Sequence, residues 1–184
     1  MRFFLVLLLI LPGAGSALEY CDELWFTRNL VFHQAGHCFG SALGKAVFGN
    51  EGCNPAGASL SKEDLAFTNR VRAEEKFEGC KIDTKRTALP VILPEVRKSL
   101  IDIPFPSLYE SGCIGWSGDP VTLHKAKDAS SDVTNIVRKG DVLLFQFEDD
   151  DEWSFVEIMK DGNTVGIGWA RVSFTPENCT MMAG

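Results

Sequence analysis

Two histidines one helical turn apart, His33 and His37, have the spacing of a possible metal centre. Histidines at i and i+4 on a helix bind zinc in metalloproteases, where a glutamate between them acts as the general base. Here Gln34 stands in place of that glutamate, and its amide cannot take a proton from zinc-bound water. Gly36 also interrupts the helix that would have to hold both rings on one face. We therefore expect no metal site and interpret the pair as polar side chains at the end of a helix.

The chain also lacks the usual patterns of a nucleophilic enzyme. Ser117 lies between glycines, but not at the spacing of a Gly-x-Ser-x-Gly turn. A cysteine hydrolase needs a free thiol, whereas the cysteines of this chain form an even set. No glycine-rich phosphate-binding loop occurs. We predict that the protein is not an enzyme and that it needs no cofactor.

The six cysteines are predicted to form three disulfides, because an even set in an exported chain is typical of a disulfide framework. Four lie in the N-terminal half and two in the C-terminal half, which favours two bonds plus one. The sequence leaves fifteen pairings possible. Cys21 and Cys38 flank a helix about 20 Å long, too far apart to bond with each other. If the helices run up and down, the expected pairs are Cys21–Cys53 and Cys38–Cys80.

The first residues predict export. Arg2 gives a positive start, an apolar run follows over 3–12, and small residues follow over 13–17. This order is that of a secretory signal peptide, too short for a finished membrane span. We expect a signal peptide at 1–17, a mature chain from Leu18 that is periplasmic or secreted, and no membrane insertion after cleavage.

The charge of the chain limits its partners. With 184 residues and a formal charge of −7, it is acidic and has no basic stripe, which argues against nucleic acid as a partner. Its length suits one ordinary domain or two small ones.

Residues 18–81 are predicted to form a helical module. Apolar residues recur about once per helical turn over 22–35, and a second short helix is expected over 42–48. Ser61 and Asp64 resemble a capping box, which begins a third helix running to about Phe77.

Residues 82–184 are predicted to contain an extended connector followed by strands. Residues 82–110 are rich in proline and apolar pairs, which indicates a packed, extended connector with one short helix over 95–100. Residues 111–184 contain alternating apolar segments over 142–147, 153–159 and 165–172, with a hairpin turn signal at 160–163. This spacing favours a small β-barrel. The acidic run Glu148–Glu152 lacks the spacing of a calcium loop and is interpreted as a solvated turn.

The stretch Thr27–Phe39 resembles the YARHG family of extracellular bacterial domains. In that family an Arg-Asn pair on a helix is followed by an Ala-Arg-His-Gly turn, an aromatic residue and a second short helix. The residues that match are Arg28, Asn29, Phe32, Gly36 and Phe39. Where the family has Ala-Arg-His, this chain has His33-Gln34-Ala35. The resemblance covers residues 21–50 and implies a location outside the cytoplasm rather than an activity.

The C-terminal module resembles a bacterial SH3-like domain. Such domains run from a glycine-aspartate turn, here Gly140-Asp141, through a tryptophan, here Trp153, to a Gly-Trp pair, here Gly168-Trp169. The chain ends lie close together in that fold, so a Cys113–Cys179 bond is expected. A YARHG-like module before an SH3-like one is also the order in a family of exported bacterial envelope proteins. The predicted fold is therefore α+β, a small disulfide-bonded helical N-terminal module followed by an SH3-like β-barrel.

SH3-like domains of bacteria often bind cell-wall material or peptides, so this resemblance implies binding. The candidate ligand-binding residues are Trp116, Trp153 and Trp169. Trp153 and Trp169 could instead fill the core, whereas Trp116, flanked by glycines, is the candidate for an exposed ring. The expected ligand is peptidoglycan or an envelope protein. The alternative is an inhibitor or assembly partner of another exported protein.

Overall fold

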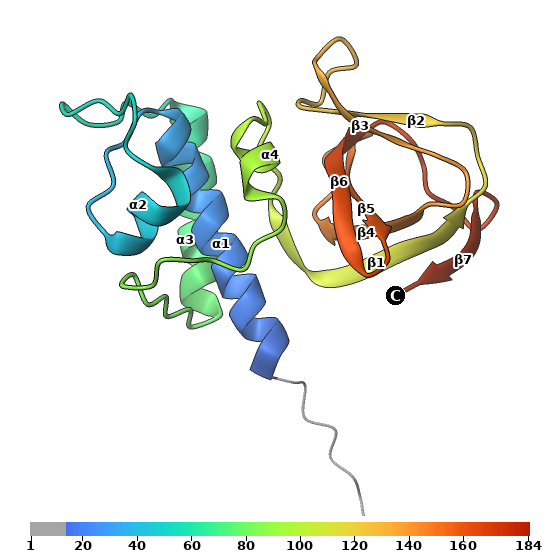
Figure 1. The fold of residues 1–184 in the computed structure, drawn as a ribbon, viewed down its shortest axis with the longest axis horizontal. Coiled ribbons are helices and arrows are strands. Elements are labelled where there is room, and N and C mark those ends of the chain that lie inside the picture. Colours follow the sequence, from blue (N-terminus) through green and yellow to red (C-terminus); the bar gives the residue numbers. More distant parts are fainter. Residues whose placement is uncertain (1–13) are drawn as a thin grey trace, which may run out of the picture.

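The structure, a computed structural model, describes residues 14–184 and the side chains of residues 19–184. The first 13 residues, with most of the predicted signal peptide, lie outside the described residues. In the described range the chain is α+β, with four helices followed by seven strands (Figure 1). None of the helices described here has the length and apolar character needed to cross a membrane.

The N-terminal part is helical, as predicted. Its helices are α1 (Ala14–Gln34), α2 (Ala42–Phe48) and α3 (Lys62–Phe77). The predicted capping box is present at the start of α3, where the Ser61 hydroxyl accepts the Asp64 N–H and the Asp64 carboxylate accepts the Ser61 N–H. The core that α1 shares with α2 is largely aromatic and consists of Trp25, Phe26, Leu30, Phe39, Leu43 and Phe48.

The C-terminal part is one antiparallel sheet. Its strands are β1 (Pro106–Trp116), β2 (Val121–His124), β3 (Val133–Val137), β4 (Val142–Phe147), β5 (Ser154–Lys160), β6 (Asn163–Ala170) and β7 (Cys179–Ala183). They lie in the order β3-β2-β6-β5-β4-β1-β7. The sheet curls around a core (Figure 1) whose buried members are Cys113, Trp116, Leu123, Val137, Leu143, Val156, Ile158, Ala170 and Cys179.

The predicted SH3-like β-barrel is not supported, because the two edge strands do not pair with each other. Among the described residues, β7 pairs with β1 and β3 pairs with β2, each on one side only. A barrel requires its first and last strands to be hydrogen-bonded, so that no edge remains. The C-terminal part is therefore a curled, open sheet.

Two glycines on β6 permit the curl. Thr134 and Asn135 of β3 donate side-chain hydrogen bonds to backbone carbonyls of β6, so β3 lies close against it. A Cβ on Gly168 would lie 2.9 Å from the Leu123 Cβ, and one on Gly166 would overlap the Asn135 side chain. Glycine is required at both positions because another strand approaches their backbone so closely. The Gly168-Trp169 pair of the sequence thus has a packing role in this fold.

All six cysteines form disulfides, with two bonds in the helical part and one in the sheet, as expected. The predicted Cys113–Cys179 bond is confirmed. The predicted pairing within the helical part is wrong, because the bonds observed there are Cys21–Cys80 and Cys38–Cys53.

The short second helix explains this difference. Because α2 is only about 10 Å long at 1.5 Å per residue, the chain returns quickly to the end of α1 that it has just left. There the Asn54 N–H donates to the Gly36 carbonyl at 2.7 Å, and the Asn50 side chain binds both backbone groups of Phe39. Cys53 therefore lies beside Cys38. Helix α3 then runs back along α1, so that Cys80, three residues after the end of α3, lies beside Cys21 in the first half of α1.

The connector forms a layer between the helices and the sheet. It contains the expected short helix, α4 (Pro94–Lys98), which lies between the two parts in Figure 1. The buried side chains that join the connector to the sheet are Leu100, Phe147, Phe155, Ile167 and Trp169. The indole N–H of Trp169 donates to the Asp102 carbonyl at 2.8 Å. The middle of strand β5 is therefore buried on both faces, by the curl of the sheet on one and by the connector on the other.

Candidate functional site

Two of the three predicted ligand-binding tryptophans lie in the core. Trp116 and Trp169 are each 2% exposed. The expectation that the Trp116 ring is exposed is wrong, because the ring folds over Gly118, where an added Cβ would overlap it. Its indole N–H is also satisfied internally, by the Asp119 carbonyl at 2.8 Å. Neither ring offers a surface to a ligand.

Trp153 is the predicted tryptophan that keeps part of its surface exposed. It borders a shallow hollow of 380 Å³ together with Pro120, His124 and Arg171. Its ring stands at 90° to the His124 ring, with 6.2 Å between the ring centroids. It packs against the cluster that contains Trp169, whereas Trp116 belongs to the core inside the curl. The structure thus does not bring the three rings together into one site.

The two histidines at the end of α1 pack against aromatic rings. The His33 ring lies 5.3 Å from the Phe48 ring, and the His37 ring stands edge-on to the Phe39 ring at 5.0 Å. Burial lowers the pKa of His33, and the nearby Lys98 ammonium lowers it further. Within residues 14–184 no group of three or more His, Cys, Asp or Glu side chains is arranged to hold a metal ion.

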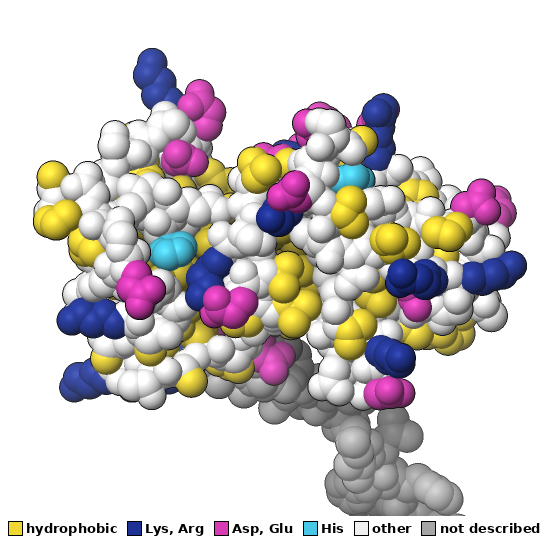
Figure 2. Space-filling model, turned by 45° about the horizontal axis from the view of Figure 1, so that its top comes forward, with side chains coloured by type: hydrophobic (Ala, Val, Ile, Leu, Met, Phe, Trp, Pro, Cys, Tyr) yellow, Lys and Arg dark blue, Asp and Glu magenta, His cyan; other side chains and the backbone are white. Residues whose placement is uncertain are grey.

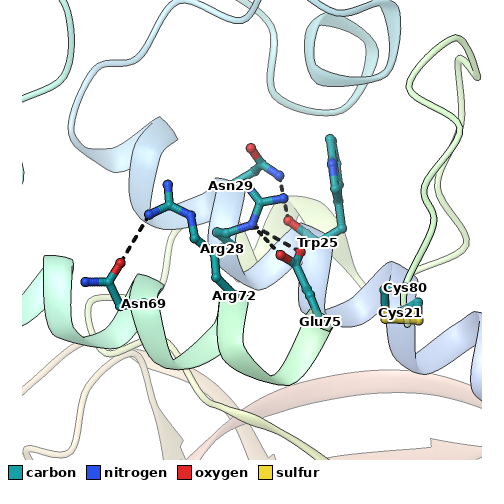
Figure 3. A network of polar contacts seen from close by, with 8 residues as sticks. All are labelled: Cys21, Trp25, Arg28, Asn29, Asn69, Arg72, Glu75 and Cys80. Atoms are coloured by element: carbon teal, nitrogen blue, oxygen red, sulfur yellow. Dashed lines mark hydrogen bonds and ion pairs between the residues drawn. A yellow bond between two sulfur atoms is a disulfide. The ribbon is translucent and has the colours of Figure 1, made fainter. Parts of the chain in front are cut away.

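The Arg-Asn pair that carries the YARHG resemblance holds helices in place (Figure 3). The Arg28 Nε donates to both carboxylate oxygens of Glu75 on α3, at 3.1 and 3.0 Å. The Asn29 amide donates to the Trp25 carbonyl, one turn earlier on α1, at 2.7 Å. Both side chains are occupied by these contacts, which gives the pair a structural role.

A groove of 520 Å³ lies between β1, the turn that joins β4 to β5, and the segment that follows β6. We call it the hairpin groove. The apolar side chains that line it are Phe145, Phe147, Val172, Phe174 and Met182. The rings of Phe145 and Phe174 lie 4.7 Å apart. Tyr109, which is 87% exposed, lies on its β1 side. Its volume is in the range of ligand-binding sites, and its lining combines apolar with polar side chains.

A bulge in β1 widens this region. Pro106 pairs with Phe147 and Ser111 pairs with Phe145, so the four residues between them on β1 face Gln146 alone on β4. Bulges of this kind redirect side chains and interrupt pairing. Here the bulge leaves Tyr109 and its neighbour Leu108, 51% exposed, projecting beside the groove.

The acidic turn between β4 and β5 supplies one wall of the hairpin groove. The carboxylates in the lining are those of Glu148, Asp149, Asp151 and Glu152. Glu148 pairs with Arg70 and Glu152 pairs with Arg171, whereas no ion pair within the described residues involves Asp149 or Asp151. No lysine or arginine among the described residues lines the groove. Figure 2 shows charges of both signs interspersed over the face that it draws.

Ionisable side chains are also buried between the helices and the sheet. Arg97 on α4 has no exposed surface; it pairs with Glu23 of α1 and donates to the Thr27 hydroxyl at 3.2 Å. Glu157 on β5 is 1% exposed and accepts a hydrogen bond from the Thr164 hydroxyl at 3.2 Å. Its other carboxylate oxygen has no hydrogen-bond partner among the described residues.

Burial raises the pKa of Glu157 to about 7. The hydrogen bond from Thr164 opposes this rise, the Glu23 carboxylate adds to it, and the Arg97 guanidinium opposes it. Glu157 is therefore a proton-binding group at near-neutral pH, enclosed in the layer where the two parts of the molecule meet.

Sequence reasoning identified the acidic turn but not the groove beside it. The apolar lining comes from β4, β7 and the segment after β6, and their proximity depends on the curl of the sheet. For Glu157 a signal was present, since an acidic residue lies between Val156 and Ile158 in an apolar strand segment. Such a residue in a strand that is buried on both faces must itself be buried.

Two family models match different parts of this chain. The YARHG domain matches residues 12–75, which confirms that resemblance. A domain of unknown function, DUF4453, matches residues 79–184. No curated protein and no solved structure matches the chain. Because the second match covers more than half of the sequence, the chain belongs to the DUF4453 family.

Proposed function

We propose that this chain is an exported, non-enzymatic binding protein that recognises another protein of the bacterial envelope. The observation that supports this most is the hairpin groove, which opens to solvent and combines aromatic side chains with an acidic wall. The three disulfides and the YARHG domain are consistent with a periplasmic or extracellular location. An inhibitor or assembly partner of an exported protein would use the same groove.

We also propose that the DUF4453 part is a relative of bacterial SH3-like domains whose sheet is curled but open. The order of the Gly140-Asp141 turn, Trp153 and the Gly168-Trp169 pair along the strands supports this relationship. So does the role of Gly168, which lets β3 lie against β6. The resemblance implies binding rather than catalysis.

A photo-crosslinking amino acid at Tyr109 tests the groove as the binding site. Tyr109 is 87% exposed beside the groove, and Phe77, 83% exposed at the end of α3, provides a matched position away from it. Expressed in a bacterial host that exports the chain, the Tyr109 variant is expected to form a discrete adduct after irradiation, and the Phe77 variant is not. Electrophoresis and mass spectrometry would identify the partner. Equal adducts from both positions, or none from Tyr109, would contradict the proposal.

A second candidate ligand is the cell wall, and the partly exposed Trp153 ring beside a hollow of 380 Å³ favours it. Aromatic faces of this kind bind sugar rings and peptide stems. If this site binds peptidoglycan, the wild-type chain will sediment with purified cell-wall sacculi and the Trp153→Ala variant will remain in solution. Leu65→Ala, which changes a half-exposed side chain on α3, is the control. No sedimentation of the wild type would remove this candidate.

A further inference from the structure

We infer that the segment bound in the hairpin groove is cationic, with basic side chains on either side of an apolar one. This inference rests on the proposed function, since it names the chemistry of the protein partner that the groove would take. The argument has three parts: the charge of the groove wall, its apolar lining, and the matching charge of a second hollow on the other side of β1.

Two of the four carboxylates in the groove wall have no cationic partner within the described residues. Asp149 and Asp151 are exposed, and neither is paired with a cation within the described residues. The ion pairs of the two neighbouring glutamates are also exposed, with Arg70 and Arg171 more than half exposed. Exposed pairs of this kind form weakly and exchange readily with other cations. Basic groups of a ligand can therefore interact with several carboxylates, and the overall charge of −7 favours their approach.

The lining beneath the acidic wall is suited to an apolar side chain. Phe145, Phe174 and Met182 all contribute to it, and both phenylalanines pack against the core inside the curl. Aromatic side chains and methionine are enriched where proteins bind one another, and the anchoring contact is usually one buried apolar group. An occupant with only basic residues would leave this surface in water.

A second hollow, of 210 Å³, lies on the other side of the exposed part of β1 and is also lined by acidic and apolar side chains. Leu108 and Glu110 line it, whereas Tyr109 and Ser111 line the hairpin groove, as expected for alternate residues of a strand. Glu19 of α1 adds to its negative charge, whereas Glu23 is already paired with Arg97; no lysine or arginine among the described residues lines it. A cationic segment crossing β1 would meet carboxylates on both sides.

The same charges disfavour the other occupants. A second copy of the chain would bring an equally acidic face to the groove, and like charges placed together oppose binding. A nucleic acid would be repelled in the same way. A basic segment of another exported protein is the occupant for which charge and apolar contact act together.

Fluorescence anisotropy with a labelled heptapeptide of alternating lysine and leucine tests this inference on the full mature chain. Neutralising the wall with Asp149→Asn and Asp151→Asn is expected to weaken binding roughly fivefold, since each exposed charge contributes modestly. Asparagine tolerates the left-handed backbone at Asp151, where φ is 53°. The matched control is Glu51→Gln with Asp119→Asn, two exposed carboxylates outside the groove, which is expected to change the affinity less than twofold.

Two further measurements complete the test. The Tyr109→Ala variant is expected to bind the same peptide with lower affinity. A peptide in which glutamate replaces lysine is expected not to bind the wild-type chain. If both double variants weaken binding equally, only the overall charge matters and the inference is wrong. It is also wrong if the glutamate peptide binds as well as the lysine peptide. In either case a specific crosslink at Tyr109 would still support the proposed function, so the two failures are distinguishable.

Discussion

Replacing Arg97 with alanine is expected to lower the free energy of unfolding by about 3–5 kcal/mol, the usual cost of removing one partner of a buried ion pair. Arg97 has no exposed surface, and the Glu23 carboxylate that it pairs with is 18% exposed. The guanidinium also lies over the rings of Phe26 and Phe147, at 4.4 and 5.2 Å from their centroids. Its removal leaves Glu23 without a cation and an empty space between α1, α4 and the sheet. Urea unfolding with the disulfides intact measures the loss.

Arg171→Ala is the matched control for this prediction. Arg171 and its partner Glu152 are 62% and 66% exposed, so the loss of their ion pair is expected to change the free energy of unfolding by no more than about 1 kcal/mol. Similar losses for the two variants would show that the buried position of Arg97 has no special importance. An Arg97 variant as stable as the wild type would mean that the two parts do not depend on this contact.

The contribution of Glu157 to the stability of the chain is expected to fall as the pH rises from about 4.5 to about 7, because the unfolded state then releases a proton that the folded state keeps. Its pKa is raised by folding from 4.5 to about 7, so the folded state binds this proton more tightly than the unfolded state. The stabilisation is complete below 4.5 and is lost as the pH rises through 7. The difference amounts to roughly 3 kcal/mol at 1.36 kcal/mol per pKa unit. The charged groups that face Glu157 are Glu23, Arg97 and Glu110.

Glu157→Gln isolates this contribution from that of the other titrating groups. The amide keeps the size of the side chain and can still accept the Thr164 hydrogen bond. The free energy of unfolding of the two proteins, measured from pH 4 to pH 8, is expected to diverge with rising pH, with the variant the more stable at pH 8. Asp149→Asn, at an exposed site, should follow the wild type. Parallel curves for wild type and Glu157→Gln would contradict the prediction.

The helices could be predicted because their signals are local. The capping box at Ser61 and the apolar spacing of α1 act within one or two turns, and both are present as expected. The disulfide pairing could not be predicted, because it depends on how the chain returns to the end of α1 after α2. That path is fixed by the hydrogen bonds of Asn50 and Asn54, which no sequence pattern predicts.

The sheet was predictable as a set of strands but not in its closure. Strand alternation reports which faces are buried, whereas closure depends on how edge strands meet. The burial of Trp116 was missed for a related reason. The flanking glycines suggested that the Trp116 ring is exposed. In the structure this ring instead packs over Gly118. Of the candidate site, the sequence indicated the acidic turn, and its apolar half forms only when three separate segments come together.

The disulfides also bear on the order in which an exported chain can be oxidised. Cys21 and Cys38 are the first two cysteines along the chain, and an oxidase acting on thiols as they emerge would join them. Once α1 has formed, their positions are separated by about 20 Å of helix, which no disulfide can bridge. Cys38 is instead bonded to Cys53, 15 residues later, and Cys21 to Cys80, 59 residues later. Helix α1 thus keeps the first two cysteines of the chain from cross-linking with each other.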